Sequence, residues 1–211
     1  IFRQVCEQKP FVVQNQQFDT QNGYQKLFGS CAMARHALCL GGDHSVSSSS
    51  VLASMHKHPK LKVIWIDAHP DIHTYNSSVS GNTHGMPLSI ATGLEKKHWA
   101  SRMNLRKLDF EDLVYVGIRD IDEFEGQTIK ENNIKHYSVD QVLDYIRKVD
   151  EPIHISFDID ALDPSYVSST GTRVANGLHP DEVRIMIEEA CVDEKLVSLD
   201  VVEFNGELGD P

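Results

Sequence analysis

The feature that most constrains the fold of this chain is a repeated alternation of short apolar runs with longer amphipathic stretches. The runs are rich in Val, Ile and Leu, and the stretches between them have helical character. This alternation is typical of an α/β protein built on a parallel sheet. The predicted strands are residues 36–40, 61–66, 113–118, 152–157 and 197–202.

Helices are expected between these runs. The clearest covers residues 181–191, where apolar residues recur at helical spacing and Pro180 suits the first turn. The others cover residues 46–58 and 139–148. No internal repeat or linker interrupts the pattern, so we expect one domain over residues 1–211. Residues 1–34 are atypical, with weak periodicity and many Gln and Asn, and should hold loops and one or two helices.

Acidic and histidine residues collect directly after each apolar run. In open parallel sheets, binding sites form at the carboxyl ends of the strands. Side chains two residues apart on an extended chain point the same way, so those of residues 67–71 should converge, as should Asp158 and Asp160. The segments are Gly41-Gly-Asp-His-Ser45, Asp67-Ala-His-Pro-Asp71, Arg119-Asp-Ile-Asp122, Asp158-Ile-Asp160 and Glu203.

Carboxylates gathered in one crevice repel one another and lose hydration, and a pair of divalent cations removes both penalties. Taken singly, each segment has a plainer explanation. An Asp at a strand end commonly starts a turn or caps a helix, and residues 41–45 also fit a Gly-rich turn capped by Ser45. Several such segments in one chain favour the metal site.

The predicted ligand set has four carboxylates, two imidazoles and no thiolate: His44, Asp67, His69, Asp71, Asp158 and Asp160. Such hard donors favour Mn²⁺, with Mg²⁺, Fe²⁺ or Co²⁺ as alternatives, over a structural zinc ion. Six ligands suit two ions that share bridging carboxylates. Two ions about 3.5–4 Å apart lower the pKa of a water bridging them towards ~7, and the resulting hydroxide performs hydrolysis.

Charge and hydropathy exclude other classes of partner. The net charge of −11 argues against a surface that neutralises phosphates. An acidic surface suits a cationic substrate, although solubility explains it equally well. No apolar run approaches the ~20 residues that span a bilayer. We therefore expect neither nucleic acid nor membrane as a partner. The four cysteines, Cys6, Cys31, Cys39 and Cys191, have no CxxC spacing and are typical of reduced thiols, so we expect a cytoplasmic or, alternatively, mitochondrial location.

The segments together resemble the pattern of the arginases, a family of ureohydrolases. The motifs GGDHS, DAHPD, SGNTHGMP, GIRDID, SFDIDALDP and TGT follow in the order of that family, from about Leu38 to Asn205. The resemblance implies a three-layer α/β/α fold with a mainly parallel sheet, two Mn²⁺ per chain and, as assembly, a homotrimer. It also implies hydrolysis of the guanidinium group of L-arginine to L-ornithine and urea.

The resemblance further implies how the ligands divide between the two ions. One ion takes His44 and Asp71, the other takes His69 and Asp160, and both take the bridging residues Asp67 and Asp158.

Three residues form the implied catalytic set: the ligand Asp71 together with His84 and Glu203. His84 matches the histidine that carries a proton to the leaving amine, as suits an imidazole that titrates near neutrality. Glu203 matches the acid that holds the substrate guanidinium through charge-assisted hydrogen bonds. There is a simpler alternative for each of these two residues. His84 could be a loop histidine hydrogen-bonded to the backbone, and Glu203 could be an acid at a strand end that pairs with Lys or Arg.

Recognition of the amino-acid end of arginine is implied for a further group. Asp122 matches the residue that faces the α-amino group, and Ser80 and the position of His73 face the α-carboxylate. Thr172 lines the same pocket, with a plain turn as the alternative explanation of TGT. Asp120 resembles a second acid near the substrate.

Three departures from the family pattern bear on function. The family usually has Asn at the position of His73, so we expect substrate preference to change more than the chemistry. Gly206 stands where the family has Pro, which loosens the loop after Glu203. The family also carries strands and helices on both sides of the matched region, so we expect a chain truncated at one or both ends.

Several alternatives remain open. An agmatinase or another guanidino hydrolase would share the metal ligands, although SGNTHGMP and Asp122 favour arginase. A catalytically impaired arginase-like paralogue is supported by His73 and the missing ends, and opposed by the intact ligand set. A single-zinc deacylase would leave several of the acids unused.

Overall fold

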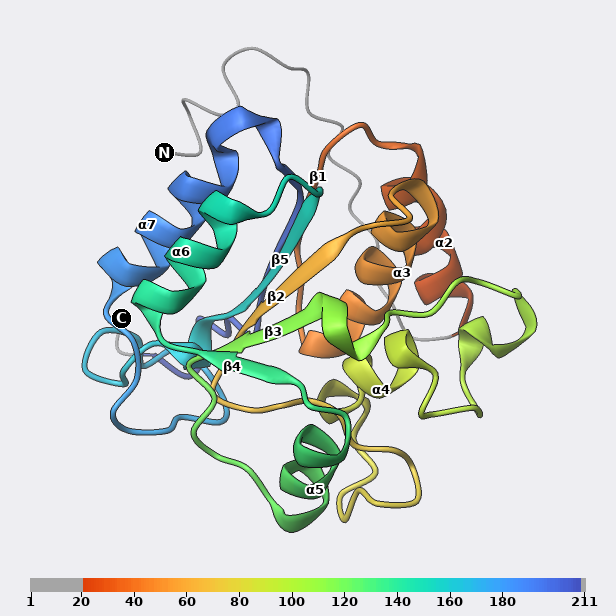
Figure 1. The fold of residues 1–211 in the computed structure, drawn as a ribbon. Helices are drawn as coiled ribbons and strands as arrows, with labels where there is room; N and C mark the ends of the chain where they lie inside the picture. Colours follow the sequence, from red (N-terminus) through yellow and green to blue (C-terminus); the bar gives the residue numbers. More distant parts are fainter. Residues whose placement is uncertain (1–20, 210–211) are drawn as a thin grey trace.

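The computed structural model describes residues 21–209, and its centre is a six-stranded sheet in which every pair is parallel (Figure 1). The strands lie in the order β1-β6-β5-β2-β3-β4. The α/β class with a parallel sheet is confirmed. The bounds are β1 Ala37–Leu40, β2 Lys62–Ile66, β3 Leu113–Val116, β4 Lys135–Tyr137, β5 Ile153–Asp158 and β6 Leu196–Val202.

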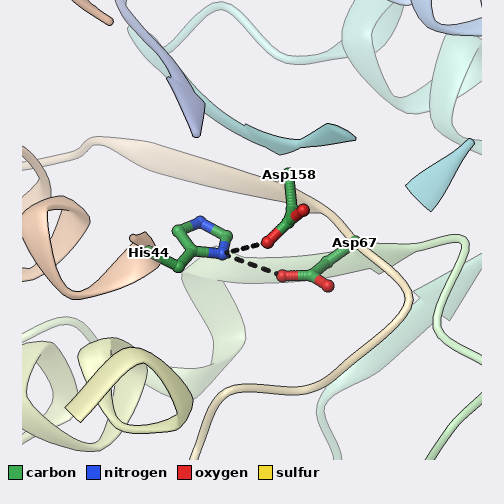
Figure 2. A group of neighbouring side chains, drawn as sticks. All are labelled: His44, Asp67 and Asp158. Atoms are coloured by element: carbon green, nitrogen blue, oxygen red, sulfur yellow. Dashed lines mark ion pairs between the residues drawn. The ribbon is translucent and has the colours of Figure 1, made fainter. Parts of the chain in front are cut away.

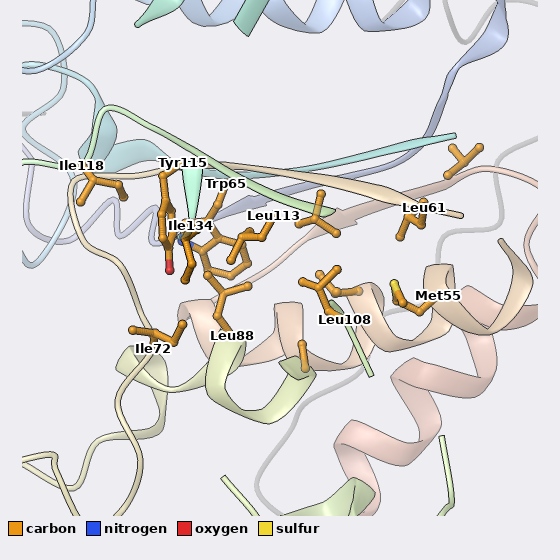
Figure 3. Close-up of a cluster of buried hydrophobic side chains, with 14 residues drawn as sticks. Met55, Leu61, Trp65, Ile72, Leu88, Leu108, Leu113, Tyr115, Ile118 and Ile134 are labelled. Carbon is orange, nitrogen blue, oxygen red and sulfur yellow. The ribbon is translucent and has the colours of Figure 1, made fainter. Parts of the chain in front are cut away.

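One face of the sheet is covered by α3 (Ser47–Lys57) and α4 (Pro87–Thr92). Met55 of α3 and Leu88 of α4 belong to one buried cluster with Trp65 of β2, as Figure 3 shows. Apolar burial of this kind is the main favourable contribution to folding.

The opposite face is covered by α6 (Val139–Lys148) and α7 (Pro180–Cys191). Ile64 points away from Trp65 because successive side chains of a strand alternate, and it lies in a second buried cluster with Ile146 of α6 and Met186 of α7. Because both faces are covered, the strands read as continuous apolar runs. The result is the three-layer α/β/α arrangement visible in Figure 1.

Local capping signals set where the helices begin. In α6, the Ser138 hydroxyl accepts from the Gln141 amide, and the Gln141 side chain accepts from the Ser138 amide. α5 (Glu123–Glu131) begins after Asp122, whose carboxylate accepts a hydrogen bond from the Glu125 amide. This cap holds Asp122 in place just beyond the end of β3.

All five predicted strands are present with small shifts at their ends, and the helix expected over residues 139–148 is α6. The sequence pattern does not predict β4, because this short edge strand reads Lys-His-Tyr and is largely exposed. It also misses α4 and α5, which are short.

The expectation for residues 1–34 is tested only in part. α2 (Gln21–Met33) is one of the helices expected there, and it packs on α3 through Phe28 and Leu52. Residues 1–20 lie outside the described part of the chain. Within residues 21–209, no helix combines the length and the apolar character needed to cross a membrane.

Candidate metal centre and substrate cavity

The strand order brings together loops that are far apart in the sequence. β5 and β6 come last along the chain and lie between β1 and β2, so the carboxyl ends of all four strands are neighbours. Such a change of direction in the strand order is where open α/β sheets bind ligands. His44, which follows β1, therefore meets Asp67 after β2 and Asp158 at the end of β5 (Figure 2).

The first cluster is centred on His44. Its Nδ1 atom lies 3.0 Å from an oxygen of Asp67, 3.0 Å from one of Asp71 and 3.1 Å from one of Asp158. The ring is 1% exposed, and among the described residues Nδ1 has no hydrogen-bond partner of good geometry. Three carboxylates around one buried nitrogen favour a positive charge between them.

The orientation of His44 decides which atom faces the carboxylates. Nε2 lies 2.8 Å from the Ser156 hydroxyl, which itself donates to Ser47 (3.0 Å) and so can accept from Nε2–H. The ring also stacks on Trp65, with centroids 4.1 Å apart and planes 8° from parallel. This assignment leaves the Nδ1 lone pair facing three carboxylates, an arrangement that fits a divalent cation.

The second cluster shares Asp67 with the first. His69 Nδ1 lies 3.1 Å from Asp160 and 3.5 Å from Asp67. Trp65 donates its indole N–H to Asp67 (3.0 Å), and Thr172 donates its hydroxyl to Asp160 (2.7 Å). Two groups that share Asp67 could therefore each hold an ion: His44, Asp67 and Asp158, and Asp67, His69 and Asp160. A third acid–histidine group, His73, Asp122 and Glu125, lies apart from Asp67.

Electrostatics at the clusters reflect an excess of buried negative charge. Burial and then the charge of Asp67 raise the pKa of Asp71 to about 7. The same two causes raise the pKa of Asp158 well above its ordinary value. Burial lowers the pKa of His69, but hydrogen bonding to Asp160 and Asp67 outweighs it and raises that pKa to about 11. Bound cations would neutralise this charge.

Two site residues have strained backbones. Asp71 (φ 51°) and Glu203 (φ 64°) adopt the left-handed region that residues other than Gly rarely occupy. Glu203 is held there by its amide, which donates to the Gly42 carbonyl (2.8 Å), and by its carboxylate, which accepts from the His44 amide (2.7 Å). Such strain clusters at functional sites.

A cavity of about 390 Å³ opens above the clusters. Every predicted site residue except His44 and Asp67 lines it, and those two are fully buried ligand candidates. In its wall, His84 Nδ1 lies 3.7 Å from the Glu203 carboxylate. This contact with the Glu203 carboxylate raises the pKa of His84 despite partial burial.

The residues predicted for the amino-acid end line the same cavity. His73 Nε2 lies 2.9 Å from Asp122, so these two side chains contact each other. Ser80 accepts from the Asn82 amide (3.2 Å), and Asp120 lies 3.6 Å from His69 Nε2.

Sequence reasoning missed four residues that shape the site. Ser156 and Trp65 each stand two positions before a predicted ligand, so the alternation of strand side chains could have identified both. Arg119 donates to the carbonyls of Asp160 (2.8 Å) and Val174 (2.7 Å) and thereby joins two loops of the site. Glu125 lines the cavity from α5. Arg119 belongs to the GIRDID motif, but its role depends on distant carbonyl groups that the motif does not reveal, and the sequence carries no comparable signal for Glu125.

The fold and the site together indicate the class of protein. It is an α/β protein with an open parallel sheet and, at the carboxyl ends of its strands, two acid–histidine clusters that form a candidate binuclear metal centre. Comparison with known proteins narrows this class. The chain belongs to the arginase family, whose sequence model matches residues 4–210.

Individual relatives agree with this assignment. The chain is 38% identical over 200 residues to an arginase of Plasmodium berghei, a match that covers 86% of this chain and 56% of the relative. It is 37% identical over 210 residues to an arginase of Glaciozyma antarctica, covering 90% and 60% respectively. The chain thus spans little more than half the length of these relatives.

Solved structures agree as well. The arginase of Entamoeba histolytica, crystallised in complex with L-ornithine, matches with a TM-score of 0.83 at 31% identity over 100% of this chain and 83% of that one. The arginase of Bacillus subtilis matches with a TM-score of 0.83 at 31% identity over 90% and 73%.

Proposed function

We propose that this chain hydrolyses the guanidinium group of L-arginine to L-ornithine and urea at a centre that holds two Mn²⁺ ions. The observation that carries the proposal is the sharing of Asp67 by two acid–histidine clusters beneath a cavity lined by His84 and Glu203. Family membership supports it, as does the L-ornithine bound by the Entamoeba histolytica arginase.

The residues of the two clusters fit the ions in number and kind. One ion would take His44 and Asp71, the other His69 and Asp160, with Asp67 and Asp158 common to both. Hard oxygen and imidazole donors without thiolate suit Mn²⁺. When bound, such a pair of ions lowers the pKa of a water to near neutrality and so makes it nucleophilic.

Glu203 is assigned to the substrate guanidinium. Its side chain is mostly buried, one oxygen accepts from the His44 amide, and it lines the cavity beside the clusters. A carboxylate held in this way can accept charge-assisted hydrogen bonds from a guanidinium and keep its planar carbon beside the ligands.

His84 is assigned to the leaving group. After water adds to the guanidinium carbon, the bond from that carbon to the side-chain nitrogen of ornithine breaks, and this nitrogen needs a proton. The contact with Glu203 raises the pKa of His84 and so favours the protonated imidazole, which can donate that proton. Asp122, His73, Ser80 and Thr172 would face the amino-acid end of the substrate.

A direct assay tests the proposal. The protein is stripped of metal, reloaded with Mn²⁺ and given arginine, agmatine or guanidinobutyrate while urea is measured. We expect arginine to be the best substrate and activity to vanish on chelation. Turnover of agmatine alone would show an agmatinase instead.

The proposed role of His84 has its own test. His84→Asn should bind two Mn²⁺ per chain, because His84 belongs to neither cluster, and should lower kcat by about 10²–10⁴-fold, the usual contribution of a general acid. Isothermal titration gives the stoichiometry and urea release the rate. An unmodified protein that binds two ions and hydrolyses no guanidine would be an impaired paralogue.

A further inference from the structure

A third group of ionisable side chains lies in the wall of the cavity. His73 Nε2 is 2.9 Å from an oxygen of Asp122 and 3.9 Å from an oxygen of Glu125. His73 comes from the loop after β2, whereas the two acids flank the start of α5. The group is therefore assembled by the fold.

The His73 ring is held firmly in this position. Its Nδ1 atom lies 3.0 Å from the Ser77 hydroxyl, and the ring stacks on Phe124 with centroids 5.5 Å apart. Its own amide donates to the Gly85 carbonyl (3.0 Å). Both ring nitrogens thus have protein partners, and a ligand can engage Nε2 only by separating it from Asp122.

The Asp122 carboxylate is likewise engaged on both oxygens. One accepts from the Glu125 amide (2.9 Å) as the cap of α5, and the other lies against His73. The side chain is 50% exposed and lines the cavity, so its second oxygen is accessible to a ligand. Glu125, which is buried beside it, adds a second acceptor.

A primary ammonium is the ligand group that this pair of acids would take. It carries three N–H donors and a full charge, whereas imidazole Nε2 offers at most one donor. An ammonium that donates to the Asp122 oxygen already in contact with His73 Nε2 would compete with the imidazole for that oxygen.

We propose that His73 is a specificity-determining residue that competes with the ammonium group of the substrate for Asp122. The inference rests on the proposed function, since it concerns the amino-acid end of the same substrate. His73 should weaken the binding of guanidines with an α-ammonium group. It should not weaken the binding of 5-guanidinopentanoate, which keeps the guanidinium and carboxylate of arginine but lacks the amino group.

The test compares the Mn²⁺-loaded protein with its His73→Asn variant. The ratio of kcat/KM for arginine to kcat/KM for 5-guanidinopentanoate should rise about 3- to 10-fold, the range expected when one competing hydrogen bond is removed. The gain should lie in KM for arginine. Because both substrates carry the carboxylate, any effect of residue 73 on that group cancels in the ratio.

A binding measurement gives the same comparison without turnover. Isothermal titration measures the affinities for L-ornithine and for 5-aminopentanoate, which lacks the α-amino group. The ratio of the first affinity to the second should be about 3- to 10-fold higher in His73→Asn than in the unmodified protein. His73→Gln serves as a second variant if His73→Asn is unstable. His136→Asn, on the exposed edge strand β4, is the matched control and should leave both ratios unchanged.

The possible failures are distinguishable. If the unmodified protein hydrolyses arginine and the ratios stay the same or fall in the variants, His73 is not a competitor. If the unmodified protein hydrolyses no guanidine, the proposed function is wrong, and the ornithine titration still decides the role of His73.

Discussion

The imidazole of His44 is oriented by two side chains from neighbouring strands, Ser156 of β5 and Trp65 of β2. Neither belongs to the two ligand groups, yet together they aim Nδ1 at the three carboxylates. Partners of this kind fix the tautomer and direction of a metal-binding histidine.

Ser156→Ala should therefore weaken metal binding without unfolding the protein. We expect the Mn²⁺ affinity of at least one site to fall about 10- to 100-fold, as is usual when such a partner is lost. Isothermal titration of metal-free protein measures it. The matched control is Ser198→Ala, a buried serine on β6 whose hydroxyl has no hydrogen-bond partner among the described residues. Equal affinities in both variants would contradict the role of Ser156.

The contact between His84 and Glu203 leads to a second prediction, which concerns the pKa of His84. The contact with the Glu203 carboxylate is the largest cause of the raised pKa of His84, so Glu203→Gln should lower that pKa towards about 6.5. An NMR titration of the ring measures the change. His98, whose pKa is lowered mainly by burial, should keep its titration midpoint.

The contact between His84 and Glu203 also makes the stability of the folded protein depend on pH. Because folding raises the pKa of His84, the contact contributes stability that is fully present below the unfolded pKa of about 6.5 and is lost as the pH rises through the folded value. In Glu203→Gln this pH dependence should shrink. A His84 pKa unchanged by the substitution would show that the two side chains do not interact in solution.

Between secondary-structure elements, a buried polar network links α3 to the sheet. His154 of β5 lies 3.0 Å from Asp200 of β6 and 3.0 Å from Ser54 of α3, and Ser50 of α3 donates to Asp200. Burial tends to raise the pKa of Asp200, but the charge of His154 together with hydrogen bonds from His154, Ser50 and Ser47 outweighs burial and lowers that pKa. Because α3 begins just after His44, the network also holds that ligand candidate in position.

His154→Ala should reduce the free energy of unfolding by about 3–5 kcal/mol, because Asp200 would stay buried without its partner. Urea denaturation at neutral pH measures the loss. His136→Ala on the edge strand β4 should change it by no more than about 0.5 kcal/mol. The difference in free energy of unfolding between the unmodified protein and His154→Ala should become smaller in acid. The reason is that the stability contributed by the lowered pKa of Asp200 is lost as the pH falls through that pKa in the folded protein. A loss equal to that of the control would contradict this account.

For the whole molecule, metal binding and folding should be coupled, because the paired clusters concentrate carboxylates that repel one another until cations are bound. Mn²⁺ at about 100 times its Kd should add about 2.7 kcal/mol, which corresponds to a rise in Tm of about 5–10 °C for a chain of this size. Differential scanning calorimetry with and without a chelator measures it. Asp160→Asn, which removes a ligand from one cluster, should reduce the rise. No rise in the unmodified protein would contradict the metal centre.

The same calorimetry tests the expected single domain over residues 1–211, which should give one cooperative transition. The homo-oligomer stays a prediction, and light scattering of the Mn²⁺-loaded protein checks it.

Much of this protein follows from local sequence signals. Apolar runs define five of the strands, and candidate ligands directly follow several of them. β2 ends at Ile66, however, Asp71 has a left-handed backbone and Asp160 lies in a 3-10 turn, so bends of the chain bring these side chains together and not the expected alternation along a strand. The motifs also indicate the family, because each ligand segment directly follows its strand. These features depend on residues within a few positions of each other, so the sequence alone carries them.

Other features depend on which distant segments become neighbours. The insertion of β5 and β6 between β1 and β2 places Ser156 against His44, and it lets Arg119 join the loops after β3 and β5. The pairing of His73 with Asp122 likewise needs the loop after β2 to meet the start of α5. Tertiary packing alone decided these contacts, because they are set by non-local strand order and helix docking, for which spacing along the chain holds no signal.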